Sequence, residues 1–355
     1  MFLDNQSVLI TGGTGSLGKV LTRRILSNEL GKPKKVIIFS RDEAKQHFMR
    51  MDYLNKKTAT DEIIYNNFKN LLEFRIGDIR DYRSVAASLK DADIVINVAA
   101  LKQVPTCEYF PQEAVFTNID GAQNIVRAIE EHGYLVKTVV GVSTDKACKP
   151  INVMGMTKSI QERIFIRGNL VAPNTRFICV RYGNVLASRG SVIPLFHEQI
   201  KSGGPLTITT EDMTRFLLSL DMAVDTIFAS LQNANRGETF IPKISSARIV
   251  DVARALIGNK RIRIDITGIR PGEKIHEILV SEEESVRTVD RGNYYVIQPI
   301  LPELKTKTNY AKSDFVNLEY SSRDGVLSFS AVVRLLKKHK LMVQDRLIHD
   351  GEFLK

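Results

Sequence analysis

The sequence predicts an α/β fold in which a doubly wound parallel sheet is followed by a smaller C-terminal lobe. A glycine-rich turn lies between an apolar strand and a helix near the N-terminus. Apolar strands then alternate with helical patterns as far as Tyr182, and this alternation loosens after Gly183. Strands connected by helices form right-handed crossovers, which produce a parallel sheet.

Composition narrows the class of protein. The 355 residues are 43% hydrophobic and 25% charged, as in ordinary soluble proteins. No apolar run approaches the roughly 18–20 residues of a membrane helix, and the N-terminus lacks the basic segment of a signal peptide. Cys107, Cys148 and Cys179 have no metal-binding spacing and are expected to be free thiols. We therefore expect a cytoplasmic protein with no membrane insertion and no metal site.

The net charge of +10 favours anionic partners. No basic stripe interleaved with aromatic residues and no nucleic-acid-binding motif accompanies it. A solvated basic surface or a phosphate-bearing small ligand explains the charge, and we expect no nucleic-acid partner.

The first strand, Ser7–Thr11, leads into the pattern G-x-x-G-x-x-G and then into a helix over Leu17–Leu26. Glycines in this place permit a tight turn and a close approach of pyrophosphate, and the helix N-terminus favours the anion. This context predicts a Rossmann dinucleotide site. Its expected contacts are Gly12, Thr14, Gly15, Ser16, Leu17 and Gly18.

The second strand, Lys35–Ser40, ends in Ser40-Arg41, with Lys45 one turn further on. An NAD-preferring fold has Asp or Glu here for the ribose 2′-hydroxyl. A hydroxyl and a guanidinium suit a 2′-phosphate instead, so the sequence predicts NADP. Ser40 is also suited to capping the next helix, and both roles are compatible.

Further strands end in residues suited to the rest of the cofactor. Residues 55–70 are expected to form a loop or insertion, and the third strand then ends in Asp78-Ile79, where an adenine would lie. The fourth ends in Ala99-Ala100-Leu101-Lys102, whose small residues allow the nicotinamide half to approach the backbone. A helix is expected from Pro111 to about His132, and it contains Asn118.

The stretch from 138 to 159 carries the candidate chemistry. A strand ends in Ser143-Thr144-Asp145-Lys146, and a helical pattern then places Met154 and Lys158 on one face. A hydroxyl, a carboxylate and two amines form a candidate acid–base site. Ordinary helix capping by Ser, Thr or Asp is the alternative.

The C-terminal half is less regular. Residues 184–194 form a loop, 206–209 a short strand, and Arg189, Arg215 and Arg270 lie near glycines in a pattern suited to a diphosphate or to a plain surface. We expect residues 1–183 to form the NADP-binding domain, with 216–242 returning to it. We assign 184–215 and 243–300 to the smaller lobe, and no chemistry to the tail 301–355.

A consistent motif set carries a family resemblance. It comprises GGTGSLG (12–18), SRDE (40–43), AALKQVP (99–105), STDKA (143–147), RYGNVLASRGSVIP (181–194), MTRF (213–216) and RPGEK (270–274). Together these motifs resemble extended short-chain dehydrogenase/reductases acting on nucleotide sugars, specifically the UDP-N-acetylglucosamine 4,6-dehydratases of capsule, O-antigen and protein glycosylation pathways. The resemblance covers about residues 1–300.

One position departs from the superfamily pattern Tyr-x-x-x-Lys, because Met154 precedes Lys158. A thioether cannot act as a base. Met-x-x-x-Lys resembles the capsule subgroup that combines 4,6-dehydration with inversion at C5.

The resemblance implies roles for the central residues. Lys146 is the expected base at C5, Asp145 the acid at the C6 hydroxyl, and Thr144 a partner of the C4 hydroxyl. Lys158 holds the nicotinamide ribose. We expect positive charge and partial burial to lower the pKa of Lys146. The acceptor of the C4 proton stays open between water, Thr144 and a loop residue.

The resemblance also implies two sets of contacts. Further cofactor contacts are expected at Ala99, Ala100, Lys102, Asn118, Ser143 and Tyr182. Contacts to a UDP-sugar are expected at Lys102, Asn184, Arg189, Ser191, Val192, Thr207, Thr209, Arg215, Arg270 and Glu273.

Other functions share these features. A UDP-sugar 4-epimerase needs the same cofactor without elimination at C6, and a C5-retaining dehydratase differs only in stereochemistry. A non-catalytic NADP(H)-binding regulator would explain the missing tyrosine but not the retained acid and amines. The family resemblance further implies a homo-oligomer, hexamer or dimer.

Overall fold

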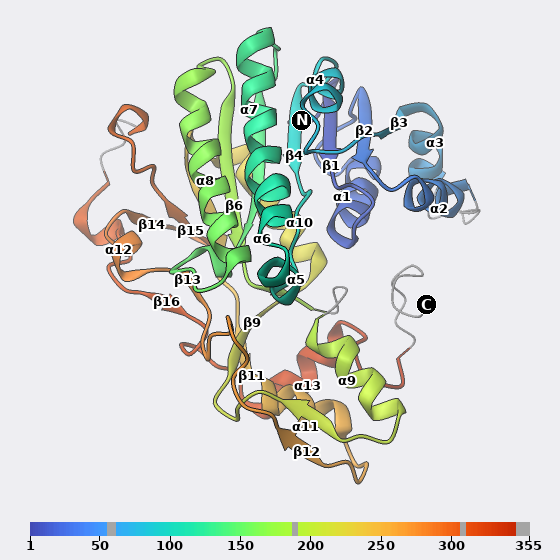
Figure 1. Ribbon diagram of the computed structural model, residues 1–355, viewed down its shortest axis with the longest axis vertical. Coiled ribbons are helices and arrows are strands. Elements are labelled where there is room, and N and C mark those ends of the chain that lie inside the picture. The colour runs from blue at the N-terminus through green and yellow to red at the C-terminus, as the bar shows by residue number, and fades with distance from the viewer. Residues whose placement is uncertain (55–61, 187–190, 306–309, 346–355) are drawn as a thin grey trace.

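The computed structural model describes residues 1–54, 62–186, 191–305 and 310–345 (Figure 1). Its main sheet has nine strands in the order β14-β15-β10-β6-β5-β4-β1-β2-β3. The seven strands from β3 to β10 are parallel, and β15 and β14 are antiparallel. The strands are β1 (Ser7–Thr11), β2 (Lys35–Ser40), β3 (Leu72–Ile76), β4 (Ile94–Asn97), β5 (Thr138–Thr144), β6 (Arg176–Tyr182), β10 (Thr239–Pro242), β14 (Thr288–Arg291) and β15 (Tyr294–Ile297). The predicted doubly wound fold is therefore confirmed.

Helices cover both faces of this sheet. Because successive side chains of a strand point to opposite faces, Val8 and Ile10 join one buried cluster and Leu9 joins the other. One face packs against α1 (Ser16–Leu26), α2 (Glu43–Leu54), α3 (Glu62–Leu71) and α10 (Leu220–Asn233). The other packs against α4 (Tyr82–Leu89), α7 (Gly121–His132) and α8 (Val153–Val171). A sheet covered on both faces explains strands that are apolar at nearly every position.

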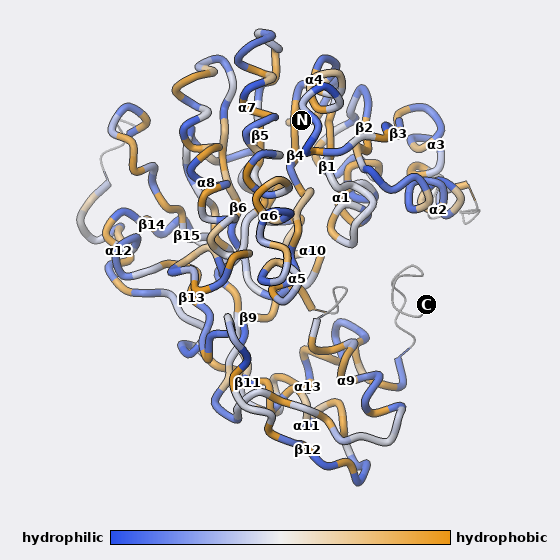
Figure 2. The backbone as a smooth tube through the Cα atoms, in the orientation of Figure 1, coloured by the Kyte–Doolittle hydropathy of each residue, from blue (hydrophilic) through white to orange (hydrophobic). Residues whose placement is uncertain are grey.

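The smaller lobe lies below the sheet in Figure 1 and has its own core. Its helices α9, α11 and α13 alternate between hydrophobic and hydrophilic residues in Figure 2, and they bury Phe196, Leu256 and Leu336 against one another. The lobe comprises β7 (Asn184–Val185), α9 (Val192–Lys201), β8 (Leu206–Ile208), β9 (Thr214–Leu218), β11 (Ser246–Arg248), α11 (Ile249–Ile257), β12 (Ile264–Ile266) and α13 (Phe329–Lys338).

The remaining described elements are short. These are α5 (Val104–Tyr109), α6 (Pro111–Ala114), the π-helical η2 (Val115–Asp120), η3 (Asp145–Ala147), β13 (Ile278–Val280), α12 (Glu282–Ser285), η4 (Pro302–Leu304), η5 (Lys312–Asp314) and β16 (Tyr320–Ser321). No helix among the described residues combines the length and apolarity needed to span a membrane.

Two sequence expectations differ from the structure. Residues 62–71 form α3 where a loop was expected, because Asn67 and Phe68 pack beneath α1; residues 55–61 lie outside the described part. Strands β14 and β15 pair in the main sheet, although 243–300 was assigned to the smaller lobe.

The tail 301–355, to which the sequence assigned no chemistry, has a structural role. It supplies β16, which pairs with β13 beside the candidate site, and α13, which completes the lobe core.

Candidate active site

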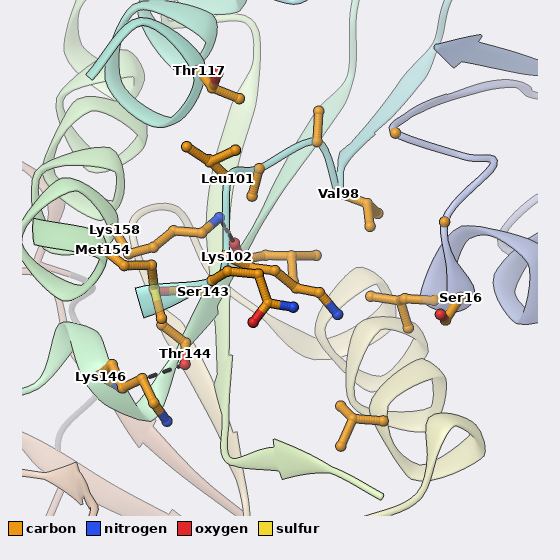
Figure 3. Close-up of a pocket in the computed structure, with 18 of the residues that line it drawn as sticks. Ser16, Val98, Leu101, Lys102, Thr117, Ser143, Thr144, Lys146, Met154 and Lys158 are labelled. Atoms are coloured by element: carbon orange, nitrogen blue, oxygen red, sulfur yellow. Dashed lines mark hydrogen bonds between the residues drawn. The ribbon is translucent and has the colours of Figure 1, made fainter. Parts of the chain in front are cut away.

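A pocket of about 740 Å³ lies between the carboxyl ends of the parallel strands and the smaller lobe. It crosses the point between β1 and β4 where the strand order reverses, which is the usual ligand position in such sheets. Figure 3 shows Ser143, Thr144, Lys146, Met154 and Lys158 on one side of the pocket, with Ser16 across from them. These five residues form one wall of the pocket, which we call the reactive wall. The glycine turn forms the opposite wall.

The glycine turn leaves no room for side chains. Gly12 has a φ of +65°, and a Cβ there would lie 2.8 Å from the Cα of Ala99. A Cβ on Gly18 would lie 2.4 Å from the Gly13 carbonyl oxygen, so this glycine serves close packing of helix on turn rather than ligand contact. The first turn of α1 carries no acidic side chain. Its N-terminus can therefore receive a phosphate.

The end of β2 presents a hydroxyl and two cations to the pocket. The Thr14 and Ser40 hydroxyl oxygens lie 2.9 Å apart. Arg41 is exposed and lies 3.8 Å from the Asp78 carboxylate. The Asp42 carboxylate accepts a hydrogen bond from the Lys45 backbone N–H at 3.0 Å and pairs with its ammonium at 3.1 Å. The Asp42 carboxylate is therefore bonded to both the backbone and the side chain of Lys45, in the first turn of α2.

The side chain of Asn118 holds the loop after β4 in place through hydrogen bonds to its backbone. Asn118 accepts a hydrogen bond from the Leu101 N–H at 2.9 Å and donates to the Leu101 carbonyl at 3.0 Å. It also donates to the Thr157 hydroxyl at 2.9 Å, which ties the loop to α8. Asn118 lies in the π-helical η2, an irregularity common at functional sites. The structure makes it a support for the pocket wall.

Lys158 and Met154 lie on the face of α8 that meets β5. The Lys158 ammonium donates to the Val142 carbonyl at 2.8 Å and to the Gln161 side chain at 2.9 Å. Burial lowers its pKa to about 8. Met154 is buried beside Cys107 and Ala114 and lines the pocket where the superfamily has tyrosine.

The acid and amine lie together at the end of β5. Thr144 donates to the Asp145 carboxylate at 2.8 Å, and the Lys146 ammonium lies 3.1 Å from the same oxygen, Oδ1. Asp145 is fully buried, and its Oδ2 has no hydrogen-bond partner among the described residues. Burial raises the pKa of Asp145, and the attraction of Lys146 offsets this only in part. A protonated Asp145 can donate to a ligand oxygen.

A second buried carboxylate, Glu277, lies on the opposite side of Lys146. Its Oε1 is 3.1 Å from the Lys146 ammonium and 3.8 Å from Nε of Arg215. Burial disfavours the Lys146 ammonium, but Asp145 and Glu277 outweigh burial and raise its pKa above the ordinary value. The sequence predicted a lowered pKa, which is wrong because the attraction of Asp145, and after it that of the unrecognised Glu277, outweighs burial. Burial alone would raise the pKa of Glu277, yet Lys146 and Arg215 lower it.

The structure brings most predicted site residues to this pocket. Those that line it are Gly12, Thr14, Gly15, Ser16, Leu17, Ser40, Arg41, Lys45, Asp78, Ile79, Ala99, Ala100, Lys102, Ser143, Thr144, Asp145, Lys146, Met154, Lys158, Tyr182, Asn184, Ser191, Arg215, Arg270 and Glu273. No group of His, Cys, Asp and Glu suited to a metal occurs in the part of the chain described.

The other predicted residues do not line it. Besides Gly18 and Asn118 these are Val192, which begins α9, together with Thr207 and Thr209. The Thr207 hydroxyl accepts a hydrogen bond from Gln199, and the Thr209 hydroxyl donates to Glu273, so both support neighbours instead. Arg189 lies outside the described residues. Glu277 was missed, although a charged residue inside the apolar run of 275–280 is a signal of a buried, functional group.

Comparisons with known proteins agree with this arrangement. A family model described as polysaccharide biosynthesis protein matches residues 8–299. The chain is 42% identical over 311 residues to a Campylobacter jejuni (strain 81-176) protein named UDP-N-acetylglucosamine 4,6-dehydratase (inverting), and covers 87% of each chain. It is 45% identical over 318 residues to a Rickettsia bellii (strain OSU 85-389) protein named UDP-glucose 4-epimerase, covering 88% of this chain and 87% of that one.

A solved structure extends the similarity to three dimensions. The X-ray structure of Pen from Bacillus thuringiensis is 34% identical, has a TM-score of 0.85, and is covered completely by 96% of this chain. Fold, motifs and matches over most of the length agree. The chain belongs to the polysaccharide biosynthesis protein family, within the extended short-chain dehydrogenase/reductases.

Proposed function

We propose that this protein is a nucleotide-sugar 4,6-dehydratase that converts UDP-N-acetylglucosamine to a 4-keto-6-deoxy sugar with inversion at C5. The observation that carries the proposal is the buried Asp145–Lys146 pair at the end of β5, inside a pocket shaped for a dinucleotide. Elimination of water needs one group that removes a proton and one that donates a proton. Asp145, whose pKa is raised, can donate the proton, and the neighbouring amine of Lys146 can remove one.

The residues present fit NADP. The glycine turn can receive the pyrophosphate. Ser40, Arg41 and Lys45 line the pocket at the end of β2 and can receive a 2′-phosphate, and Asp42, which also lines the pocket, is paired with the Lys45 ammonium at 3.1 Å. Lys158, which lines the pocket, would hold the nicotinamide ribose. When bound, NADP would supply the hydride carrier for a reversible transfer between sugar C4 and C6.

The chain's own residues supply the proton transfers. Lys146 removes the C5 proton in its neutral form, and Asp145 gives a proton to the departing C6 hydroxyl. The Asp145 oxygen Oδ2, which has no hydrogen-bond partner among the described residues, would carry that proton. Thr144 donates to Asp145, so its own oxygen can accept a hydrogen bond from the C4 hydroxyl. Arg215 and Arg270 are suited to the diphosphate.

The decisive experiment incubates the protein with NADP and UDP-N-acetylglucosamine in deuterated water. We expect a product lighter by one water, with deuterium at C5 and inverted C5 configuration by NMR. A product with retained configuration at C5 would contradict the proposed inversion but not the proposed dehydration. Absence of any conversion would leave a regulator that only binds NADP(H).

A second candidate is a UDP-sugar 4-epimerase, favoured by the name of the Rickettsia bellii relative. An epimerase does not break the C6–oxygen bond and has no need of Asp145 as an acid. A product of unchanged mass with inverted C4 would establish it in place of the dehydratase.

Arg41→Ala is expected to weaken NADP binding roughly tenfold or more while leaving NAD binding within about twofold, since one charge-assisted contact to the 2′-phosphate is lost. Fluorescence titration with the reduced dinucleotides measures both affinities. Arg83→Ala, which removes an exposed arginine of α4 outside the pocket, is the control. Equal weakening of both dinucleotides would contradict the NADP assignment.

The setting of the proposed enzyme follows from its substrate. Activated nucleotide sugars are made in the cytoplasm, where we place this protein as a supplier of 6-deoxy sugars for capsule or another surface glycan. We also propose a homo-oligomer, hexamer or dimer. Mass measurement in solution tests the assembly.

A further inference from the structure

Glu277 is held rigidly against the reactive wall although it belongs to the far end of the chain. It immediately precedes β13, lines the pocket and is 2% exposed. Its backbone N–H donates to the Ser322 hydroxyl at 2.9 Å, and its carbonyl accepts from the Ser322 N–H at 2.8 Å. The β13–β16 pair therefore fixes the position of this carboxylate relative to Lys146.

The hydrogen bonds of Glu277 differ from those of purely structural carboxylates in this protein. Buried Glu162 and Glu238 have both oxygens bonded, mainly to Arg181 and Arg291 respectively. Glu277 Oε2, like Asp145 Oδ2, is buried without a partner among the described residues. A carboxylate with an unsatisfied oxygen is costly to bury, so its presence at the pocket points to a role in the reaction.

The charges around Lys146 favour its ammonium form, which cannot act as a base. Asp145 and Glu277 each lie 3.1 Å from its ammonium, and both favour the protonated form. Arg215 and Lys274 oppose this from the smaller lobe, and Arg215 is the nearer to Glu277. An ammonium cannot remove the C5 proton, so Lys146 must first pass a proton to an acceptor. Asp145 cannot be that acceptor if it is the acid for the C6 hydroxyl.

We propose that Glu277 is the positioning residue for Lys146, holding its amine at the pocket wall and accepting its proton when the amine becomes the base. The step breaks an Nζ–H bond of Lys146 and forms an O–H bond on Glu277 Oε1, across the existing 3.1 Å contact. It converts an ion pair into two neutral groups. The attraction between the two charges, which raises the pKa of Lys146 and lowers that of Glu277, opposes this transfer, and exclusion of water by a bound substrate favours it. The neutral amine then takes the C5 proton. This inference rests on the proposed dehydratase function.

The test replaces Glu277 by Gln, which keeps the size and removes the acceptor. We expect kcat to fall about 100-fold, with KM within about threefold, because the loss falls on proton transfer. We also expect the acid limb of the kcat/KM profile to move to lower pH by about one unit or more, since an anion beside Lys146 is lost. Glu277→Asp should recover at least about tenfold of the lost kcat.

A second readout needs no turnover. Competitive acetylation of the protein across a pH series, read by mass spectrometry, gives the pH at which Lys146 is half reactive. Glu277→Gln should lower that pH, and Glu238→Gln, which removes an equally buried carboxylate outside the pocket, should leave it unchanged.

The outcomes separate the two proposals. If the wild type does not dehydrate UDP-N-acetylglucosamine, the proposed function fails, while the acetylation result still reports on the Glu277–Lys146 pair. If the wild type is active and Glu277→Gln changes neither the pH profile nor the acetylation midpoint, the inference is overturned, even if melting temperature falls. Unchanged kcat in Glu277→Gln overturns it as well.

Discussion

Lys146→Ala is expected to lower the rate of dehydration by about 10²–10⁴-fold, because no other amine lies between the two buried carboxylates. Binding of NADP should persist, since the contacts proposed for its pyrophosphate and 2′-phosphate lie on the glycine turn and at the end of β2. Fluorescence titration measures the binding, and mass spectrometry of the product measures the rate.

Removing a buried cation leaves Asp145 and Glu277 facing each other, which destabilises the fold by about 3–5 kcal/mol if both stay ionised. Lys146→Arg keeps the charge but cannot supply a neutral base at ordinary pH, so it should fold and be inactive. Lys149→Ala, which breaks a pair with Glu319 outside the pocket, is the control. An active Lys146→Arg enzyme would show that the base is elsewhere.

Asp145→Asn should separate removal of the C5 proton from the later loss of the C6 hydroxyl. The amide cannot protonate the C6 hydroxyl, so we expect dehydration to fall by about 10²–10⁴-fold. Lys146 remains, so exchange of the C5 hydrogen with solvent should continue at a measurable rate. Deuterium in recovered substrate and the yield of dehydrated product measure the two steps in one incubation.

A buried aspartate of α11 provides the comparison. Asp251 is 3% exposed and pairs with Arg248 at 2.9 Å, outside the pocket. Asp251→Asn should lower stability without changing the ratio of C5 exchange to dehydration. The role of Asp145 as the acid is refuted if Asp145→Asn lowers exchange and dehydration equally.

Much of the cofactor half could be predicted because its requirements are local. The pattern of Gly12, Gly15 and Gly18 lies within one short turn, and the strand before it and the helix after it are visible in the sequence. The ends of parallel strands meet at one edge of a sheet, so residues as distant as Ser40 and Ser143 could be assigned to one pocket.

The reactive wall was less predictable because it depends on contacts between distant segments. Glu277 reaches Lys146 only through the β13–β16 pairing, and no local pattern sets that register. The raised pKa of Lys146 depends on Asp145 and also on this missing neighbour. Thr207 and Thr209 were predicted to contact the ligand because both are polar residues of the short strand predicted over 206–209. The sequence does not reveal that their hydroxyls form hydrogen bonds with Gln199 and Glu273 instead.

The chain passes repeatedly between the sheet and the smaller lobe, with β6, β10 and β15 in one and β8, α11 and α13 in the other. A single genetic crossover therefore cannot exchange the smaller lobe as a block. Laboratory chimaeras that exchange the lobe should be designed segment by segment.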